Sequence, residues 1–369
     1  ARPARDHARR SGRAGARLPW ESARSGRDVT PTIDRRPDGS RVPIRTGLLE
    51  EHVTADVAWA AWWYLDWTGD AAAAPAVHEL VRETARYWAS RVRLDRHGRA
   101  HIYGVIGPDE YHEPVDDSAY TNVMARWNLR RAAEVSPPGE ERERWRALAG
   151  AMVDGYDPRR GVHEEFAGFF RLDPLIVADL AERPVDADRL LGRPRVRRSQ
   201  VVKQADVLML HHLVPGELRP GTLDADLAYY DPRTAHGSSL SPAVHAALLA
   251  RLGRVDEAVA LLGRCARFDI DDVNGTAVNG LHIATQGGVW QALVMGFAGV
   301  RPQGDALGVD PRIPPAWAAL RLSLRFRGAR VQLCLRPGQV EARAEPGVDL
   351  MLPGGRRLRA GPDGATASA

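Results

Sequence analysis

Three carboxylates fall within five residues of the segment Gly104–Glu113, at Asp109, Glu110 and Glu113. Carboxylates that crowd together repel one another, which raises the pKa of one of them and keeps it protonated near neutral pH. A protonated carboxylic acid can give its proton to a leaving glycosidic oxygen. A solvated acidic turn or a Ca²⁺ site would use the same residue types, so the segment alone leaves three interpretations open.

Aromatic side chains accompany this acidic segment at Tyr103, Tyr111 and Tyr120. An aromatic face is apolar, whereas a carboxylate accepts hydrogen bonds from hydroxyls. Together they suit a polyhydroxylated ring better than a bare cation. The spacing therefore favours a sugar site over a Ca²⁺ site.

A second segment, His236-Gly237-Ser238-Ser239, has the composition of an anion-binding loop. A glycine lets backbone N–H groups approach a ligand closely, the serines add hydroxyl donors, and the histidine can add positive charge. We expect a helix to begin at about Pro242, which would direct the N-terminal end of its dipole at the loop. An ordinary helix cap and turn has the same composition, so this alternative also stays open.

Lys203 is the single lysine among 51 basic residues. A GC-rich genome explains an excess of arginine without invoking an anionic partner. A lysine is needed where a compact ammonium must bind, for example on phosphate. Lys203-Gln204-Ala205-Asp206 and Pro19-Trp20-Glu21-Ser22-Ala23 are therefore two further candidate site segments.

Apolar residues recur at helical spacing through most of the first 304 residues. Helices are predicted at residues 48–68, 75–94, 119–135, 140–156, 200–213, 241–253, 255–268 and 287–299. This order indicates stacked helical hairpins. Residues 321–360 instead alternate apolar and polar, which predicts short antiparallel strands. We predict a helical domain over 1–304, a β-sheet domain over 305–360 and a disordered tail over 361–369.

Several classes of protein are excluded by the composition. No apolar run approaches the roughly 20 residues that a membrane span needs. Two cysteines cannot build a disulfide framework or a zinc cluster, and no HxxH or HExxH pair suggests a metal site. The arginines are spread along the chain, which disfavours a nucleic-acid partner. The Arg-rich start has no apolar segment of a secretory signal, so we expect a cytoplasmic protein.

Longer stretches resemble glycoside hydrolase family 65, which contains inverting phosphorylases of α-glucosides such as maltose, trehalose, kojibiose and nigerose. These stretches are PWESA, GVIGPDEYHEPVDDSAYTNVMARWNL, KQADVL and YYDPRTAHGSSLSPAVHA, and the resemblance extends from about Arg17 to Gly328. It implies a mainly α fold, an (α/α)6 barrel followed by a small antiparallel β domain. The chain would correspond to the second half of that barrel and the β domain.

By position, the resemblance implies Glu110 as the general acid. It implies a glucosyl-binding set of Trp20, Glu21, Thr54, Lys203 and Gln204, and a phosphate-binding set of His236, Gly237, Ser238 and Ser239. No cofactor is implied, and inorganic phosphate is the co-substrate. Because phosphate is itself the nucleophile, phosphorolysis needs no second carboxylate to activate water. The expected products are β-glucose 1-phosphate and a free sugar.

Two alternatives remain at this point. One is a hydrolase of the same family, similar to a trehalase, although such hydrolases are expected to lack the His-Gly-Ser-Ser loop. The other is a truncated remnant that binds carbohydrate without turning it over. A half-barrel would expose apolar helix faces, which invites either a homodimer or the missing N-terminal half as a partner.

Overall fold

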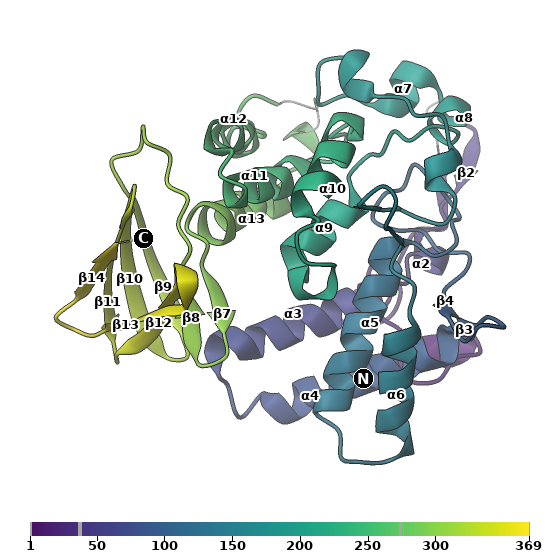
Figure 1. Ribbon diagram of the computed structural model, residues 1–369. Helices are drawn as coiled ribbons and strands as arrows, with labels where there is room; N and C mark the ends of the chain where they lie inside the picture. Colours follow the sequence, from purple (N-terminus) through teal and green to yellow (C-terminus); the bar gives the residue numbers. More distant parts are fainter. Residues whose placement is uncertain (1, 36–38, 273–274, 276, 369) are drawn as a thin grey trace. The chain divides into compact units, whose positions relative to one another are not determined.

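The computed structural model describes residues 2–35, 39–272, 275 and 277–368 (Figure 1). The structure divides into two compact units. Unit 1 contains Ala1–Trp62 and Ala72–Ala235, and unit 2 contains Trp63–Ala71 and His236–Ala369. No helix among the described residues is both long and apolar enough to cross a membrane.

Unit 1 is built mainly from helices. They are α1 (Arg2–Arg10), α2 (Thr46–Leu49), α3 (Val53–Thr68, whose last turns belong to unit 2), α4 (Ala74–Arg91), α5 (Ala119–Glu134), α6 (Glu140–Ala151), α7 (Ala187–Leu191), α8 (Arg193–Val196), α9 (Asp206–Leu213) and α10 (Leu223–Tyr230). The short 3-10 turns are η1 (Phe169–Arg171), η2 (Val177–Asp179), η3 (Pro215–Glu217) and η4 (Asp231–Arg233). Three antiparallel ladders pair β1 (Ile33–Arg35) with β2 (Arg41–Pro43), β3 (Arg93–Leu94) with β4 (Ala100–His101), and β5 (Tyr156–Asp157) with β6 (Val162–His163).

Helix α5 is the centre of unit 1 and is buried along nearly its whole length. Ser118 caps it, since its hydroxyl accepts the backbone N–H of Thr121 at 3.3 Å. Helices α4 and α6 lie beside α5 and bury Trp88 and Trp145 (Figure 1). A large apolar side chain stabilises the fold by about 2–3 kcal/mol when it is fully buried. This layer supports the acidic segment, which ends at Glu113, shortly before α5.

Tertiary contacts interrupt two of the predicted helices, and a third, predicted over 140–156, ends at Ala151. The helix predicted over 48–68 is broken at Glu50–His52, between α2 and α3. The buried guanidinium of Arg17 donates to the carbonyl oxygen of Leu48 at 2.6 Å, which satisfies a backbone group that a continuous helix would have used. The helix predicted over 200–213 begins only at Asp206, since Val202 pairs in parallel with Thr234.

Unit 2 begins with helices and ends in two small sheets. Its elements are α11 (Ser241–Arg251), α12 (Val255–Ala266), the 3-10 turn η5 (Ala277–Asn279), α13 (Ile283–Gln291), the π-helical turn η6 (Ala292–Phe297), β7 (Arg301–Gln303), β8 (Ala306–Gly308), β9 (Leu320–Phe326), β10 (Ala329–Arg336), β11 (Gln339–Glu345), β12 (Val348–Leu352), the 3-10 turn η7 (Pro353–Gly355), β13 (Arg356–Ala360) and β14 (Ala365–Ser368). The strand orders are β14-β11-β10-β9 and β13-β12-β8-β7, and β8 and β12 run parallel while the other neighbours are antiparallel.

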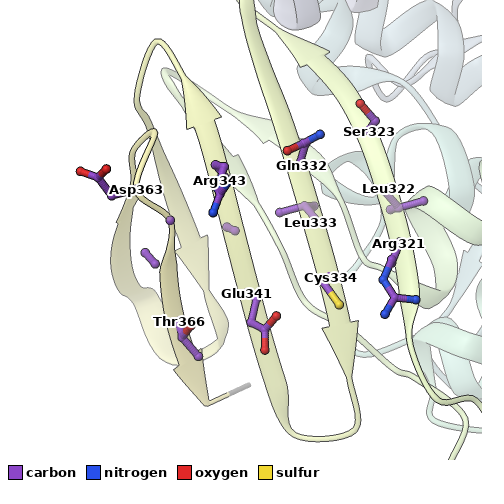
Figure 2. Close-up of a pocket in the computed structure, with 13 residues that line it drawn as sticks. Arg321, Leu322, Ser323, Gln332, Leu333, Cys334, Glu341, Arg343, Asp363 and Thr366 are labelled. Carbon is purple, nitrogen blue, oxygen red and sulfur yellow. The ribbon is translucent and has the colours of Figure 1, made fainter.

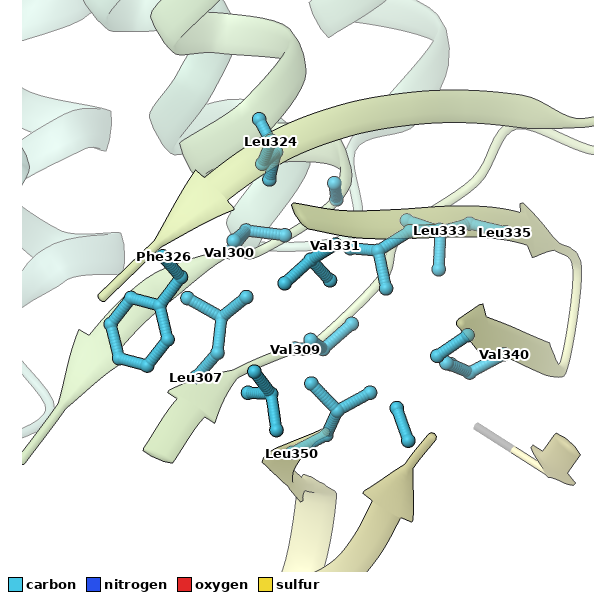
Figure 3. Close-up of a cluster of buried hydrophobic side chains, with 14 of the residues drawn as sticks. Val300, Leu307, Val309, Leu324, Phe326, Val331, Leu333, Leu335, Val340 and Leu350 are labelled. Atoms are coloured by element: carbon cyan, nitrogen blue, oxygen red, sulfur yellow. The ribbon is translucent and has the colours of Figure 1, made fainter. Parts of the chain in front are cut away.

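The alternating pattern of the strands accounts for the core between these sheets. Val331, Leu333 and Leu335 are alternate residues of β10, and they meet Leu307 and Leu350 of the other sheet (Figure 3). The prediction of a mainly helical fold followed by a small antiparallel-rich sheet is confirmed. The helix–loop–helix order is consistent with the expected (α/α)6 barrel.

The prediction of a disordered tail is wrong for four of its residues. Strand β14 pairs antiparallel with β11, with Ala365 opposite Ala342 and Ser368 opposite Gln339. The free edge of β11 offers backbone donors and acceptors that a following segment can satisfy. The boundary expected between Gly304 and Asp305 stays a prediction, and it falls inside the hairpin of β7 and β8.

Candidate active site

The acidic segment forms an ordered loop in unit 1. Val105 and Val115 exchange backbone hydrogen bonds of 2.9 and 2.8 Å, which closes the loop at its base. The N–H of Ile106 donates to the carbonyl oxygen of Leu49 at 3.0 Å and attaches the loop to the end of α2. A Cβ on Gly107 would lie 2.2 Å from Oδ2 of Asp206, so only glycine fits there.

Four hydrogen bonds join this loop to residues 203–206, at the start of α9. Gln204 Nε2 donates to the carbonyl oxygen of Pro108 at 2.6 Å, and the backbone N–H of Lys203 donates to Asp109 Oδ1 at 2.8 Å. The backbone N–H of Asp109 donates to Asp206 Oδ1 at 2.8 Å, and Lys203 Nζ donates to Glu110 Oε2 at 2.7 Å. The sequence motifs around Glu110 and Lys203 are thus brought together by both backbone and side-chain bonds.

The three carboxylates of the loop do not converge on one point. Asp109 is 4% exposed and accepts a hydrogen bond from the ring of His112 at 2.7 Å. Glu113 pairs with Arg197 at 2.9 Å. Glu110 alone of the three combines a partly open side chain, 38% exposed, with a lysine partner. Each carboxylate thus has a different partner, which argues against a shared Ca²⁺, while the expected crowding of the three groups stays a prediction.

Two groups that the sequence analysis did not select lie close to this pair. Glu50 and His52 occupy the break between α2 and α3 and are 2% and 4% exposed. Burial raises the pKa of Glu50, the nearby His52 opposes that shift, and the charge of Glu110 adds to it. Burial alone would lower the pKa of His52, but its hydrogen bond of 2.7 Å to Asp56 and its proximity to Glu50 raise that pKa to about 9.

The predicted glucosyl-binding residues differ in exposure. Trp20 is 36% exposed, and its ring meets that of His52 edge-on at 6.2 Å. Glu21 has an exposed side chain, and its backbone N–H donates to the hydroxyl of Thr30. Thr54 is fully buried, and its hydroxyl accepts the N–H of Leu18 at 3.1 Å. Thr54 therefore holds the segment before Trp20 in this structure and presents no surface to a ligand.

The three tyrosines do not form one aromatic surface. Tyr111 is anchored because its hydroxyl accepts the N–H of Ala187 at 3.1 Å. Tyr120 is 3% exposed and donates to Asp56. Tyr103 is 43% exposed and stacks on His101 with an interplanar angle of 7°. Only Tyr103 therefore has an open aromatic face among the three.

The predicted phosphate loop lies in unit 2, directly before α11. His236 is buried in a left-handed backbone conformation with φ +54°, and its Nδ1 lies 3.0 Å from the hydroxyl of Ser241. Within the part of the chain that the structure describes, the backbone N–H groups of Gly237, Ser238 and Ser239 have no hydrogen-bond acceptor. Unpaired N–H groups before a helix N-terminus can bind an anion.

A buried group with the residue types of a metal site lies elsewhere in unit 1. His163 Nδ1 and His211 Nε2 each lie 2.8 Å from Oδ2 of Asp226. These are ordinary hydrogen-bond distances, so each contact is satisfied by a ring N–H. Burial alone would raise the pKa of Asp226, but the two histidine hydrogen bonds outweigh it and lower that pKa.

A pocket of about 720 Å³ lies on the outer face of the sheet β14-β11-β10-β9 (Figure 2). Arg321, Gln332, Glu341 and Arg343 line it with mixed charges and no aromatic ring. None of the predicted site residues lines it. The sequence-derived site thus lies outside this pocket.

Two family models match the chain. The glycosyl hydrolase family 65 central catalytic domain matches residues 2–291, and the C-terminal domain of the same family matches residues 300–356. A kojibiose phosphorylase of Escherichia coli is 34% identical over 95% of this chain and 48% of its own length. One from Halothermothrix orenii is 34% identical over 91% of this chain and 46% of its own length.

Other relatives bear different names. An α,α-trehalose phosphorylase of Geobacillus stearothermophilus is 32% identical over 89% of this chain and 44% of its own length. The solved structure of a candidate kojibiose phosphorylase from the human microbiome superposes with a TM-score of 0.86 at 21% identity, over 100% of this chain and 55% of that one. The chain spans about half the length of the curated relatives it matches. On the strength of the two family models and these identities, the chain belongs to glycosyl hydrolase family 65.

Proposed function

We propose that this chain carries the catalytic acid and the phosphate loop of an inverting α-glucoside phosphorylase. The observation that carries the proposal is the contact between Glu110 and Lys203, a partly open carboxylate beside the single lysine of the sequence. The relatives named as kojibiose and trehalose phosphorylases support phosphorolysis as the reaction. The substrates are an α-glucosyl disaccharide and inorganic phosphate.

In the proposed reaction, the carboxylic acid of Glu110 protonates the glycosidic oxygen as the bond from that oxygen to the anomeric carbon breaks. A phosphate oxygen attacks the anomeric carbon from the opposite face, which inverts the configuration and gives β-glucose 1-phosphate. The free sugar leaves with the proton. Lys203 must move off the Glu110 carboxylate when that group is protonated, and a sugar hydroxyl is the replacement acceptor for its ammonium.

Phosphate is held, in this proposal, by the loop His236-Gly237-Ser238-Ser239. Support comes from its three unpaired backbone N–H groups and from its place before α11. Trp20, Glu21 and Gln204 are proposed to contact the glucosyl unit, while Thr54 acts through the segment that it fastens. No metal or other cofactor has a step in this reaction.

The hydrolase alternative needs a carboxylate base that can reach water. Glu50 is the second carboxylate near Glu110, but its side chain has no exposed surface. This observation favours phosphate over water as the nucleophile. A binding remnant without turnover is the other alternative, and it predicts sugar affinity with no product.

The proposal also includes a partner. That partner is a second copy of the chain or the N-terminal half of a family member. We also propose a cytoplasmic location, because a charged sugar phosphate is retained by membranes. The identity of the acceptor sugar is part of the test below.

The test is a screen of kojibiose, trehalose, maltose and nigerose with and without phosphate. It is run with the chain alone and with the N-terminal half of the E. coli relative added. We expect β-glucose 1-phosphate, identified by ³¹P NMR, only when phosphate is present. Glucose release that does not depend on phosphate overturns the proposal in favour of a hydrolase. Disaccharide binding by calorimetry without product identifies a remnant.

A further inference from the structure

Asp109 and His112 form a buried contact on the same loop as Glu110. Asp109 is 4% exposed and His112 is 4% exposed. His112 Nδ1 lies 2.7 Å from Asp109 Oδ2, and His112 Nε2 lies 2.9 Å from the carbonyl oxygen of Ser199. The rings of Phe166 and Phe169 pack against the imidazole at 5.1 and 5.9 Å. Water is therefore excluded from both ring nitrogens.

The partners of His112 determine its charge. A carboxylate oxygen and a carbonyl oxygen can only accept, so both ring nitrogens must donate. An imidazole that donates from both nitrogens is an imidazolium. Burial alone would lower the pKa of His112, but Asp109 outweighs burial and raises it, while Arg197 acts weakly in the opposite direction.

Two further carboxylates stand behind Asp109. Asp206 Oδ1 accepts the backbone N–H of Asp109 at 2.8 Å, and Glu165 Oε1 accepts that of Asp206 at 2.9 Å. Both are at most 2% exposed. Burial and the charge of Asp109 raise the pKa values of Glu165 and Asp206 well above their usual range, and the charge of Glu165 adds to the shift of Asp206. Asp109 thus lies between His112 and two carboxylates whose protonated form is favoured by burial.

We propose that the buried Asp109–His112 ion pair is a positioning element that sets the distance between Glu110 and Lys203. Asp109 Oδ2 is fixed by His112, so Oδ1 is directed at the backbone N–H of Lys203. Glu110 follows Asp109 directly in the chain and meets the other end of the same lysine. A change at Asp109 therefore moves the proton donor and Lys203 together. This inference rests on the proposed function only for its effect on rate.

The first test uses Lys203 as its own probe. Because the chain has a single lysine, ¹⁵N-lysine labelling gives one backbone amide signal and one side-chain signal. In Asp109→Asn, the amide has one oxygen for two donors, His112 Nδ1–H and the backbone N–H of Lys203, so one of the two contacts is lost. We expect both lysine signals to shift in Asp109→Asn. In the matched control Asp226→Asn, which disrupts another buried His–Asp contact of unit 1, both signals should stay in place.

The second measurement is ¹⁵N NMR of the histidine rings, with His112 assigned by comparison with His112→Gln. We expect both ring nitrogens of His112 to stay protonated as the pH rises above the ordinary histidine value of about 6.5. Loss of one ring proton at or below that pH, or unchanged lysine signals in Asp109→Asn, overturns the proposal. Neither readout needs catalytic activity, and the histidine spectrum of the unsubstituted protein decides the charge even when Asp109→Asn does not fold.

The third measurement separates positioning from folding. We expect Asp109→Asn to lower kcat on the order of 100-fold with little change in the KM for phosphate, as for a displaced catalytic group. Its alkaline limit of activity should move to lower pH, because His112 loses the carboxylate that holds its proton. Asp226→Asn should lower the melting temperature and leave kcat within twofold. An unchanged kcat in Asp109→Asn, with active unsubstituted enzyme, contradicts positioning, whereas inactivity of the unsubstituted enzyme contradicts the proposed function alone.

Discussion

Lys203 Nζ lies 2.7 Å from Oε2 of Glu110, and the two residues come from loops 93 positions apart in the chain. Both side chains are partly exposed, at 26% and 38%, so the pair stabilises the fold by about 1 kcal/mol or less. A contact this weak is readily exchanged for a ligand. The ion pair therefore joins the two groups that the proposed reaction needs as a protonated acid and as an ammonium that binds the sugar.

Replacing Lys203 tests whether a compact ammonium is required. We expect Lys203→Met to raise the KM for the disaccharide and to lower kcat/KM on the order of 100-fold, since a charge-assisted contact is lost. Lys203→Arg should recover little, because a planar guanidinium does not fit where a point charge binds. Steady-state kinetics check this. The control is Arg96→Lys at an exposed turn, and full activity of Lys203→Arg would contradict the account.

Gly107→Ala tests how closely the backbone of the acidic segment approaches Asp206. The added Cβ would lie 2.2 Å from Oδ2 of that carboxylate, so the loop must shift. We expect a loss of about 1–3 kcal/mol in the free energy of unfolding, measured by urea denaturation. Gly150→Ala in α6, where nothing lies within 4 Å, should instead be neutral or slightly stabilising. Equal effects of the two substitutions would show that the loop is not tightly packed.

The raised pKa of His52 predicts a pH-dependent stability. Its folded-state value of about 9 lies above the ordinary 6.5, so its contribution is complete below about pH 6.5 and disappears as the pH rises through 9. Urea unfolding at pH 6, 7.5 and 9 should show a decline of a few kcal/mol that is reduced in His52→Gln and in Asp56→Asn. If the stability of both variants declines with pH as much as that of the unsubstituted protein, the assignment to His52 is contradicted.

Ser239→Ala tests the phosphate loop of unit 2. We expect a rise of about tenfold in the KM for phosphate, equivalent to the loss of one hydrogen bond, with the KM for the disaccharide unchanged. Ser323→Ala on β9, whose side chain lines the outer pocket, is the matched control and should change neither constant. A rise in the KM for the disaccharide alone would place the loop at the sugar and not at phosphate.

The sequence predicted the parts of the site that depend on residue type in short motifs. Glu110 and Lys203 stand out because each is chemically distinctive where it occurs. Glu50 could not be found in this way, since the helical periodicity runs through it without interruption. The helix break that places Glu50 near Glu110 comes from Arg17, which lies 31 residues before Leu48 and donates a hydrogen bond to the carbonyl oxygen of Leu48.

The partner of each carboxylate in the acidic segment also depends on tertiary contacts that the spacing in the sequence does not encode. Asp109, Glu110 and Glu113 are close in sequence, yet they pair with His112, Lys203 and Arg197 respectively. The strand at the C-terminal end was missed for a similar reason, because four residues with a single strand-favouring side chain, Thr366, give a weak local signal and pair only when β11 is present.

The most direct test of the central claim compares two variants, Glu110→Gln and Glu113→Gln, in the phosphate-dependent formation of β-glucose 1-phosphate. Glutamine keeps the size of the side chain but cannot donate the proton that the leaving oxygen needs. We predict that Glu110→Gln lowers kcat by about 10²–10⁴-fold while Glu113→Gln, which loses only a surface contact with Arg197, retains most of the activity. Full phosphorolysis by Glu110→Gln would contradict the assignment of the acid.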